Sequence, residues 1–297
     1  MLDRILEGHY ATIRGAAPPL KQIRVLNWNI ERGLNLPAVM DFVRSQQPDL
    51  CILQEVDLNA KRTGRRNVAE VLAAQFQFNY VFGVEFEELS QGSDRDRAFH
   101  GQAVFARSRI MAPRILRFSR QSDRWRPRWY LPCWSVLQPR RGGRMALVAE
   151  LDFGPTRLVI YDVHLESQGD DHLRLWQLSE VVHDSLRYSL DTPVMVAGDL
   201  NTRHGPTPLR PYLLAAGFHD ACGDGKHLAT KRNGQTLDWV FIRGPALCSG
   251  TRVHQEVRAS DHYPLTTNLT LTGRGESLAR ELISRRLAST LGGNHED

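Results

Sequence analysis

The sequence predicts a single α/β domain that contains more than one β-sheet. Three observations lead to this fold class: about ten apolar runs with strand character are spread along the chain, few helical patterns lie between them, and no Pro/Gly/Ser-rich linker divides the 297 residues. A hydrophobic fraction of 41% beside 24% charged residues is ordinary for a soluble globular protein, so the chain can bury a sizeable core.

The predicted strands are short runs, many of them rich in Val, Ile and aromatic residues. They cover residues 23–30, 49–56, 80–86, 103–106, 130–137, 145–151, 158–165, 193–197, 237–242 and 264–271. Helical patterns fall between some of them: Leu36, Val39, Met40 and Val43 form one stripe, residues 68–76 are a second candidate helix, and residues 172–186 are a third.

These elements place the folded domain at residues 22–272, with residues 1–21 as a peripheral N-terminal segment. Residues 273–297 are expected to hold an amphipathic helix followed by a disordered tail. The first twenty residues carry charges at Asp3, Arg4 and Glu7 and no continuous apolar stretch, so they predict neither a signal peptide nor a transmembrane segment. A cytoplasmic location is expected.

The four cysteines are far apart and form no CxxC pair, which argues against a zinc site and a disulfide framework. We expect free thiols at Cys51, Cys133, Cys222 and Cys248. The pattern carries no signal for an oligomeric state.

The positive charge of the chain is concentrated in one segment. The formal net charge is +5, but residues 107–144 alone hold eleven arginines against one acid, Asp123, together with Trp125, Trp129 and Trp134. Arginine interleaved with aromatic residues suits phosphate-rich partners, so the segment is a candidate surface for nucleic acid or anionic lipid. The alternative is a solvated loop whose arginines pair with acids elsewhere in the chain.

Side chains of the types that can bind metal or phosphate lie at the ends of six predicted elements. The stretch VLNWNIERG breaks an apolar run with Asn29 and Glu31, where a turn is the simplest alternative reading. The same feature recurs at Glu55 and Asp57, His164 and Glu166, Asp199 and Asn201, Asp238, and Asp261 and His262. In α/β sheets such strand ends line the crevice where ligands bind.

Carboxylates that converge in one cleft repel one another and raise each other's pKa values unless a cation holds them. Each residue alone could have a structural role, as an Asx turn, an ion pair or a buried histidine. Together they predict a hard divalent ion, and oxygen ligands without cysteine favour Mg²⁺ or Mn²⁺.

The motifs WNIERG, LQEVD, YDVHLES, GDLN, LDWVF and SDHYPL follow one another in the order and at roughly the spacing of the endonuclease/exonuclease/phosphatase superfamily. The resemblance covers about residues 22–271. It implies two facing β-sheets flanked by helices, a four-layer α/β sandwich with the active site at one end.

The resemblance also implies roles for individual residues. Glu55 is similar to the principal metal ligand of the superfamily, with Glu31, Asn29 and Asp261 completing the metal site. Asp199 resembles the residue that aligns or deprotonates the attacking water, and Asp238 the partner of a catalytic histidine. The phosphate or the leaving group is expected to meet His262, His164 and Asn201.

Four further residues are candidates for substrate binding. His100 and Gln102 lie in HGQAVFARS, which resembles the substrate-proximal strand of the superfamily, and a structural role is the alternative. Arg62 and Arg65 in RTGRRN follow Glu55 closely and could meet substrate phosphates, or else form a solvated loop.

The expected function is that of a Mg-dependent phosphoesterase, and most directly a phosphodiesterase that acts on nucleic acid or a phospholipid headgroup. The chemistry needs a cation on the nonbridging oxygens, a carboxylate for the water and donors for the developing charge. The alternatives are a phosphomonoesterase for a sugar, inositol or nucleotide phosphate, and a catalytically inactive binding protein of the same fold. The sequence has VHLES where abasic-site endonucleases have a YVPN-type segment, which weakens a DNA-repair function.

Overall fold

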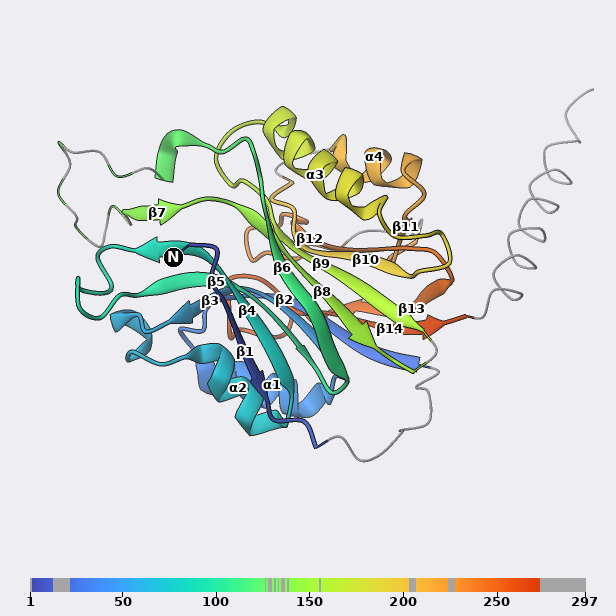
Figure 1. Cartoon of the computed structure of the whole chain (residues 1–297), viewed down its shortest axis with the longest axis horizontal. Coiled ribbons are helices and arrows are strands. Elements are labelled where there is room, and N and C mark those ends of the chain that lie inside the picture. The colour runs from blue at the N-terminus through green and yellow to red at the C-terminus, as the bar shows by residue number, and fades with distance from the viewer. Residues whose placement is uncertain are drawn as a thin grey trace, which may run out of the picture.

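Two β-sheets lie face to face, and helices cover the outer face of each (Figure 1). The computed structural model describes residues 2–12, 22–125, 127, 130, 132, 134, 137, 139–154, 156–202, 207–223 and 228–272. The predicted α/β fold class and the four-layer sandwich are confirmed.

The larger sheet has eight strands. They are β1 (Ile5–His9), β2 (Gln22–Arg32), β3 (Leu50–Leu58), β4 (Asn79–Glu88), β5 (Phe99–Ala106), β7 (Arg140–Gly142), β13 (Ala246–Val253) and β14 (Leu265–Leu271). Their order is β1-β4-β5-β3-β2-β14-β13, with β7 beside β4. Strands β2 and β3 are parallel neighbours at the centre, so their carboxyl ends reach the same edge.

The smaller sheet has six strands in the order β11-β12-β10-β9-β8-β6. They are β6 (Arg109–Arg117), β8 (Met145–Asp152), β9 (Arg157–His164), β10 (Val194–Asp199), β11 (His219–Asp220) and β12 (Asp238–Arg243). Here β9 and β10 are the parallel pair.

Among the described residues, four helices form the outer layers: α1 (Leu36–Gln46) and α2 (Val68–Phe76) cover the eight-stranded sheet, and α3 (Asp171–Ser185) and α4 (Leu209–Ala215) cover the six-stranded one (Figure 1). Side chains of Asn35, Asn67 and Asp170 cap the first three helices by accepting a hydrogen bond from a first-turn N–H. The 3₁₀ turns η1 (Lys61–Thr63) and η2 (Asp123–Trp125) lie in the connections.

Strand β2 shows why the sequences of the central strands are continuous apolar runs. Ile23 and Val25 belong to the core between the sheets, whereas Leu26 and Trp28 belong to the core under α1. Successive side chains of a strand point to opposite faces, and here both faces are buried. By the same alternation Asn29 faces the opposite sheet, at the end of the sandwich where its Nδ2 reaches Asp199.

A group of three buried polar side chains also links the two sheets. Nε2 of Gln54 donates to Oδ1 of Asn27 at 3.0 Å and to Oδ1 of Asp162 at 2.8 Å, and all three side chains are fully buried. Burial raises the pKa of Asp162 well above its usual value.

Five of the described strands lack a sequence prediction, and all five lie at sheet edges: β1, β6, β7, β11 and β13. Strand β6 contains Pro113 and a register shift between Met111 and Arg114, and Pro is tolerated at edges and bulges. Strand β13 is largely exposed and therefore has no continuous apolar run.

Some predictions fall elsewhere. Part of the predicted peripheral segment, Ile5–His9, forms β1 and pairs with β4. Most of residues 130–137, the predicted C-terminal helix and Cys133 lie outside the described residues, while Cys51, Cys222 and Cys248 are free thiols. Within the described ranges, no helix combines the length and apolar character needed to span a membrane.

Candidate active site

The ends of β9, β10 and β12 bring three predicted site residues side by side. Asp199 is paired with His164 across the parallel strands β9 and β10, and with Asp238 across the antiparallel strands β10 and β12. All three side chains are almost completely buried. Asp199 therefore lies at the centre of the group, between an imidazole and a carboxylate.

Both carboxylate oxygens of Asp199 accept hydrogen bonds. The backbone N–H of Asn201 donates to Oδ1 at 2.8 Å, and Nδ2 of Asn29 donates to Oδ2 at 3.2 Å. The same Oδ2 lies 3.6 Å from Nε2 of His164 and 3.7 Å from Nε2 of His262. Burial raises the pKa of Asp199 to about 6, although the imidazole of His262 opposes the shift.

His262 is fixed at three points. Its Nδ1 lies 2.8 Å from Oδ2 of Asp238, its backbone N–H donates to Oγ of Ser260 at 3.1 Å, and its carbonyl accepts from Nε1 of Trp28 at 3.0 Å. Burial alone would lower the pKa of His262, but the carboxylates of Asp238 and Asp199 raise it to about 9. Near neutral pH the protonated imidazole is favoured.

The pKa of His164 is shifted in the opposite direction to that of His262. Burial, with the nearby Arg144 guanidinium, holds its pKa well below the usual value, so the imidazole is neutral. Its Nδ1 lies 3.7 Å from Oε2 of Glu85, and His100 approaches the same oxygen with Nε2 at 3.9 Å. Oε1 of Glu85 accepts from Nη1 of Arg144 at 2.8 Å.

Glu85 is a site residue that the sequence interpretation missed. It lies on β4 at a register shift between Val84 and Phe86 and is fully buried. The sequence of β4 indicates such a residue, because its buried apolar run ends in acidic residues, as do the strands that carry the motifs.

Glu31 and Glu55 each sit at a bulge. One extra residue is inserted in β2 between Asn29 and Arg32, and one in β3 between Leu53 and Val56. Glu31 and Glu55 have positive φ angles of 46° and 52°, in the left-handed region that non-glycine residues rarely adopt. Bulges re-aim side chains, and here they turn two carboxylates out of neighbouring parallel strands at the same level.

The surroundings of these carboxylates connect them to the loop that carries His262. Oδ1 of Asn29 accepts from the backbone N–H of Glu31 at 3.1 Å, and Oε2 of Glu31 accepts from the backbone N–H of Asp261 at 3.1 Å. Burial would raise the pKa of Glu55, but Arg32, whose Nη2 lies 3.7 Å from Oε2, is the largest of several positive charges that hold it well below its usual value.

One set of described side chains is compact enough to hold a cation, and the superfamily resemblance implies another. Asp199, Asp238 and His262 offer ligand atoms that all lie within 4.8 Å of one another, but a cation between Asp238 and His262 would have to break their 2.8 Å bond. The second set offers oxygen atoms only, which fits Mg²⁺ or Mn²⁺. It consists of Glu55, Glu31, Asn29 and Asp261.

The four candidate substrate residues have other partners. Arg62 binds Asp57 through two bonds of 2.7 Å, and its Nη1 reaches Glu88 at 3.2 Å. Arg65 pairs with Asp96 at 2.6 Å on the exposed side of the loop.

The other two lie inside the larger sheet. His100 is fully buried with Nδ1 3.3 Å from Asp57, and the buried Gln102 donates to the carbonyl of Met145 at 3.4 Å. His100 reaches the group around Asp199 through Glu85, whose Oε2 lies near both His100 and His164.

Several arginines of the 107–144 segment are bound within the fold. Arg114 pairs with Asp184, Arg140 with Glu88 and Arg144 with Glu85. Arg126 and Arg128 lie outside the described residues, whereas Tyr130 and Trp134 are exposed. Part of the positive charge of the segment therefore lies in internal ion pairs.

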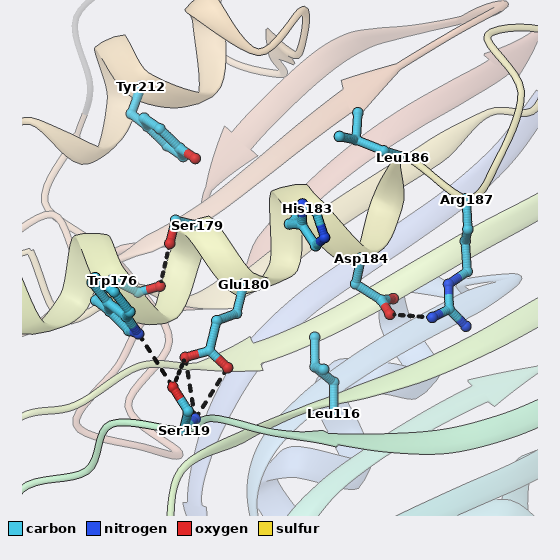
Figure 2. Close-up of a pocket in the computed structure, with 10 residues that line it drawn as sticks. All are labelled: Leu116, Ser119, Trp176, Ser179, Glu180, His183, Asp184, Leu186, Arg187 and Tyr212. Atoms are coloured by element: carbon cyan, nitrogen blue, oxygen red, sulfur yellow. Dashed lines mark hydrogen bonds and ion pairs between the residues drawn. The ribbon is translucent and has the colours of Figure 1, made fainter.

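A separate pocket of about 830 Å³ lies beside α3, and Figure 2 shows its lining. Its carboxylates already have partners: Glu180 accepts from the N–H and Oγ of Ser119, and Asp184 pairs with Arg187 at 2.8 Å. Two carboxylates on its wall disfavour a phosphate there, so the strand-end group is the better candidate for phosphate chemistry.

The chain matches the model of the Endonuclease/Exonuclease/phosphatase family over residues 26–262. No curated protein sequence matches it. Its fold is similar to that of an endonuclease/exonuclease/phosphatase from Beutenbergia cavernae DSM 12333, at 18% identity and a TM-score of 0.61, covering 85% of this chain and 72% of that one. The endonuclease/exonuclease/phosphatase from Bacteroides vulgatus matches at 14% identity and a TM-score of 0.61, over 84% and 99% of the two chains. D. rerio TDP2, solved with a single strand DNA product, matches at 16% identity and a TM-score of 0.58, over 84% and 99%. With its motifs, its sandwich and its family match in agreement, the chain belongs to the Endonuclease/Exonuclease/phosphatase family.

Proposed function

We propose that this chain is a metal-dependent hydrolase of phosphate esters, and specifically a phosphodiesterase that uses in-line attack by an activated water. One observation carries the proposal: Oδ2 of Asp199 faces the Nε2 atoms of both His164 and His262 at 3.6 and 3.7 Å. A carboxylate for the water and two imidazoles for the phosphate thus converge at the strand ends.

The metal site of the proposal is the oxygen set of Glu55, Glu31, Asn29 and Asp261. A divalent cation bound there would neutralise charge on the nonbridging oxygens of the phosphate. The low pKa of Glu55 keeps its carboxylate ionised for this role. The bulge at each glutamate gives a structural reason for the break in VLNWNIERG, because the polar residues leave the strand to face a ligand.

The remaining roles follow from hydrogen-bonding capacity. Asp199 holds the attacking water and takes its proton, since two N–H donors fix its carboxylate. His262, kept protonated by Asp238, donates to a phosphate oxygen. Neutral His164 orients the phosphate or the leaving group, and Asn201, whose Nδ2 donates to the carbonyl of Leu165 at 2.9 Å, has a second N–H for the phosphate.

Nucleic acid and a phospholipid headgroup are the proposed substrate classes. The DNA product bound to the structurally similar TDP2 supports the first. The exposed Tyr130 and Trp134 beside the arginine-rich stretch support an extended anionic partner of either kind. A cytoplasmic location stays a prediction.

A substrate panel tests the proposal. Purified protein with Mg²⁺ or with a chelator is assayed on single-stranded DNA, duplex DNA, RNA, sphingomyelin and paired small mono- and diesters. Mg²⁺-dependent cleavage of diesters is expected. Cleavage of monoesters alone would identify a phosphomonoesterase, and no cleavage of any substrate would identify an inactive member of the family.

A further inference from the structure

A lysine outside all the predicted motifs reaches the atom that is proposed to meet the phosphate. Nζ of Lys231 lies 3.0 Å from Nε2 of His262 and 3.0 Å from Oδ2 of Asp261. The lysine side chain is 27% exposed, whereas that of His262 is 2% exposed. Lys231 thus lies between the buried imidazole and the solvent.

The backbone around Lys231 is held in place. Lys231 forms an isolated bridge with His262, and its N–H donates to the carbonyl of Gln235 at 3.0 Å. Oγ1 of the neighbouring Thr230 accepts from the N–H groups of Leu237 at 2.8 Å and Asp238 at 3.0 Å. The same turn therefore positions Lys231 and the carboxylate that binds His262.

The hydrogen-bonding capacity of the ammonium group is not used up by these contacts. A lysine ammonium has three N–H donors and no acceptor. Oδ2 of Asp261 accepts one of them, whereas Nε2 of the protonated His262 carries a hydrogen and cannot accept, so two are left for a ligand on the solvent side. With Nδ1 of His262 engaged by Asp238, both Nζ and Nε2 can turn a donor toward one anionic group.

We propose that Lys231 is a second phosphate-binding residue, which together with His262 grips the oxygens of one phosphate group. The proposal rests on the proposed function, because it assigns the partner of His262 to substrate phosphate. It adds to that function a second cationic side chain, whose electrostatic attraction to the phosphate increases with the negative charge on the phosphate. Lys231 therefore contributes more to binding a terminal phosphate dianion than a diester monoanion.

The alternative is that Lys231 only pairs with Asp261 to hold the loop. Four proteins separate the two roles: wild type, Lys231→Met, Lys231→Arg and the matched control Arg157→Met. Arg157 lies at the start of β9, the end opposite His164, and its side chain is 66% exposed, so its loss removes the same charge far from the site.

The first measurement is calorimetric titration of inorganic phosphate into each metal-free protein, with melting curves to verify folding. Charge-assisted hydrogen bonds predict that Lys231→Met binds phosphate roughly 10-fold to 100-fold more weakly than Arg157→Met, while Lys231→Arg keeps part of the affinity. Equal affinities of Lys231→Met and Arg157→Met, or no binding by any of the four, would overturn the proposal.

The second measurement compares KM and kcat for a small monoester and a small diester with Mg²⁺. For each ester, the KM of Lys231→Met is divided by the KM of the wild type. The logarithm of this ratio should be about twice as large for the monoester dianion as for the diester. An equal rise for both esters, or none, contradicts phosphate binding by Lys231. If the wild type cleaves neither ester, the proposed function fails, and the phosphate titration still decides the role of Lys231.

Discussion

Nε2 of His262 lies 3.7 Å from Oδ2 of Asp199, while Nδ1 of the same ring is bonded to Asp238 at 2.8 Å. The proposed chemistry needs Asp199 ionised, so that it can take a proton, and His262 protonated, so that it can donate. The neighbours of the two groups set a pH range in which both conditions hold.

We expect a bell-shaped dependence of kcat/KM on pH. Activity should rise as Asp199 ionises through its pKa of about 6 and fall as His262 loses its proton through its pKa of about 9. Asp238 stabilises the protonated ring, so Asp238→Asn should lower that pKa and move the alkaline limb to lower pH. If the alkaline limb of Asp238→Asn stayed at the wild-type pH, deprotonation of His262 would not be the cause of the activity loss at high pH.

The bulged carboxylate Glu55 should control the metal requirement. Glu55→Gln keeps the shape of the side chain but removes the charge of the principal proposed ligand, so the Mg²⁺ concentration for half-maximal activity should rise by about tenfold or more. Calorimetric titration with Mn²⁺ should show the same weakening without any substrate. Glu256→Gln, at an exposed position, is the control, and identical Mg²⁺ titrations of the two variants would remove Glu55 from the metal site.

The buried acid Asp162 should limit stability at neutral pH. Burial raises its pKa in the folded state, so the folded protein binds this proton more tightly than the unfolded chain does, and stability falls as pH rises above the unfolded pKa. Asp162→Asn mimics the protonated acid and should raise Tm at pH 7 to 8 by at least about 2 °C, with a smaller gain near pH 4. The exposed Asp41→Asn should show neither effect. A lower Tm for Asp162→Asn at pH 7 would contradict this account.

The arginine-rich segment should matter only for extended substrates. Neutralising Arg124, Arg126 and Arg128 together should weaken binding to a polymer or an anionic vesicle and flatten its salt dependence, because fewer counterions are released. A small diester should be cleaved at the normal rate. An equal loss on both substrates would place the segment in the active site or in the fold, and no loss on either would leave a solvated loop.

The central strands and the site motifs were predictable because their signals are local. Strands β2, β3, β9 and β10 are buried on both faces, which leaves apolar runs that end visibly at Asn29, Glu55, His164 and Asp199. Edge strands β6 and β13 gave no such run, because one side of each meets solvent or carries arginines.

Pairings between distant segments could not be predicted. The position of Arg62 shortly after Glu55 suggested phosphate binding. In the structure its guanidinium instead donates two hydrogen bonds to Asp57. Glu85 and Lys231 lie on segments without a family motif, and only the folded sheets bring them to His164 and His262. Contacts of this kind depend on strand order, which a single sequence does not encode locally.

The most direct test of the central claim is the rate at which the purified protein hydrolyses a small phosphodiester with Mg²⁺, beside Asp199→Asn and the control Arg157→Met. The account predicts Mg²⁺-dependent turnover by the wild type and the control, its loss on chelation, and a fall of about 100-fold or more in Asp199→Asn, since the carboxylate that takes the proton of the water is gone. Turnover that persists in chelator, or a correctly folded Asp199→Asn that keeps the wild-type rate, would contradict it.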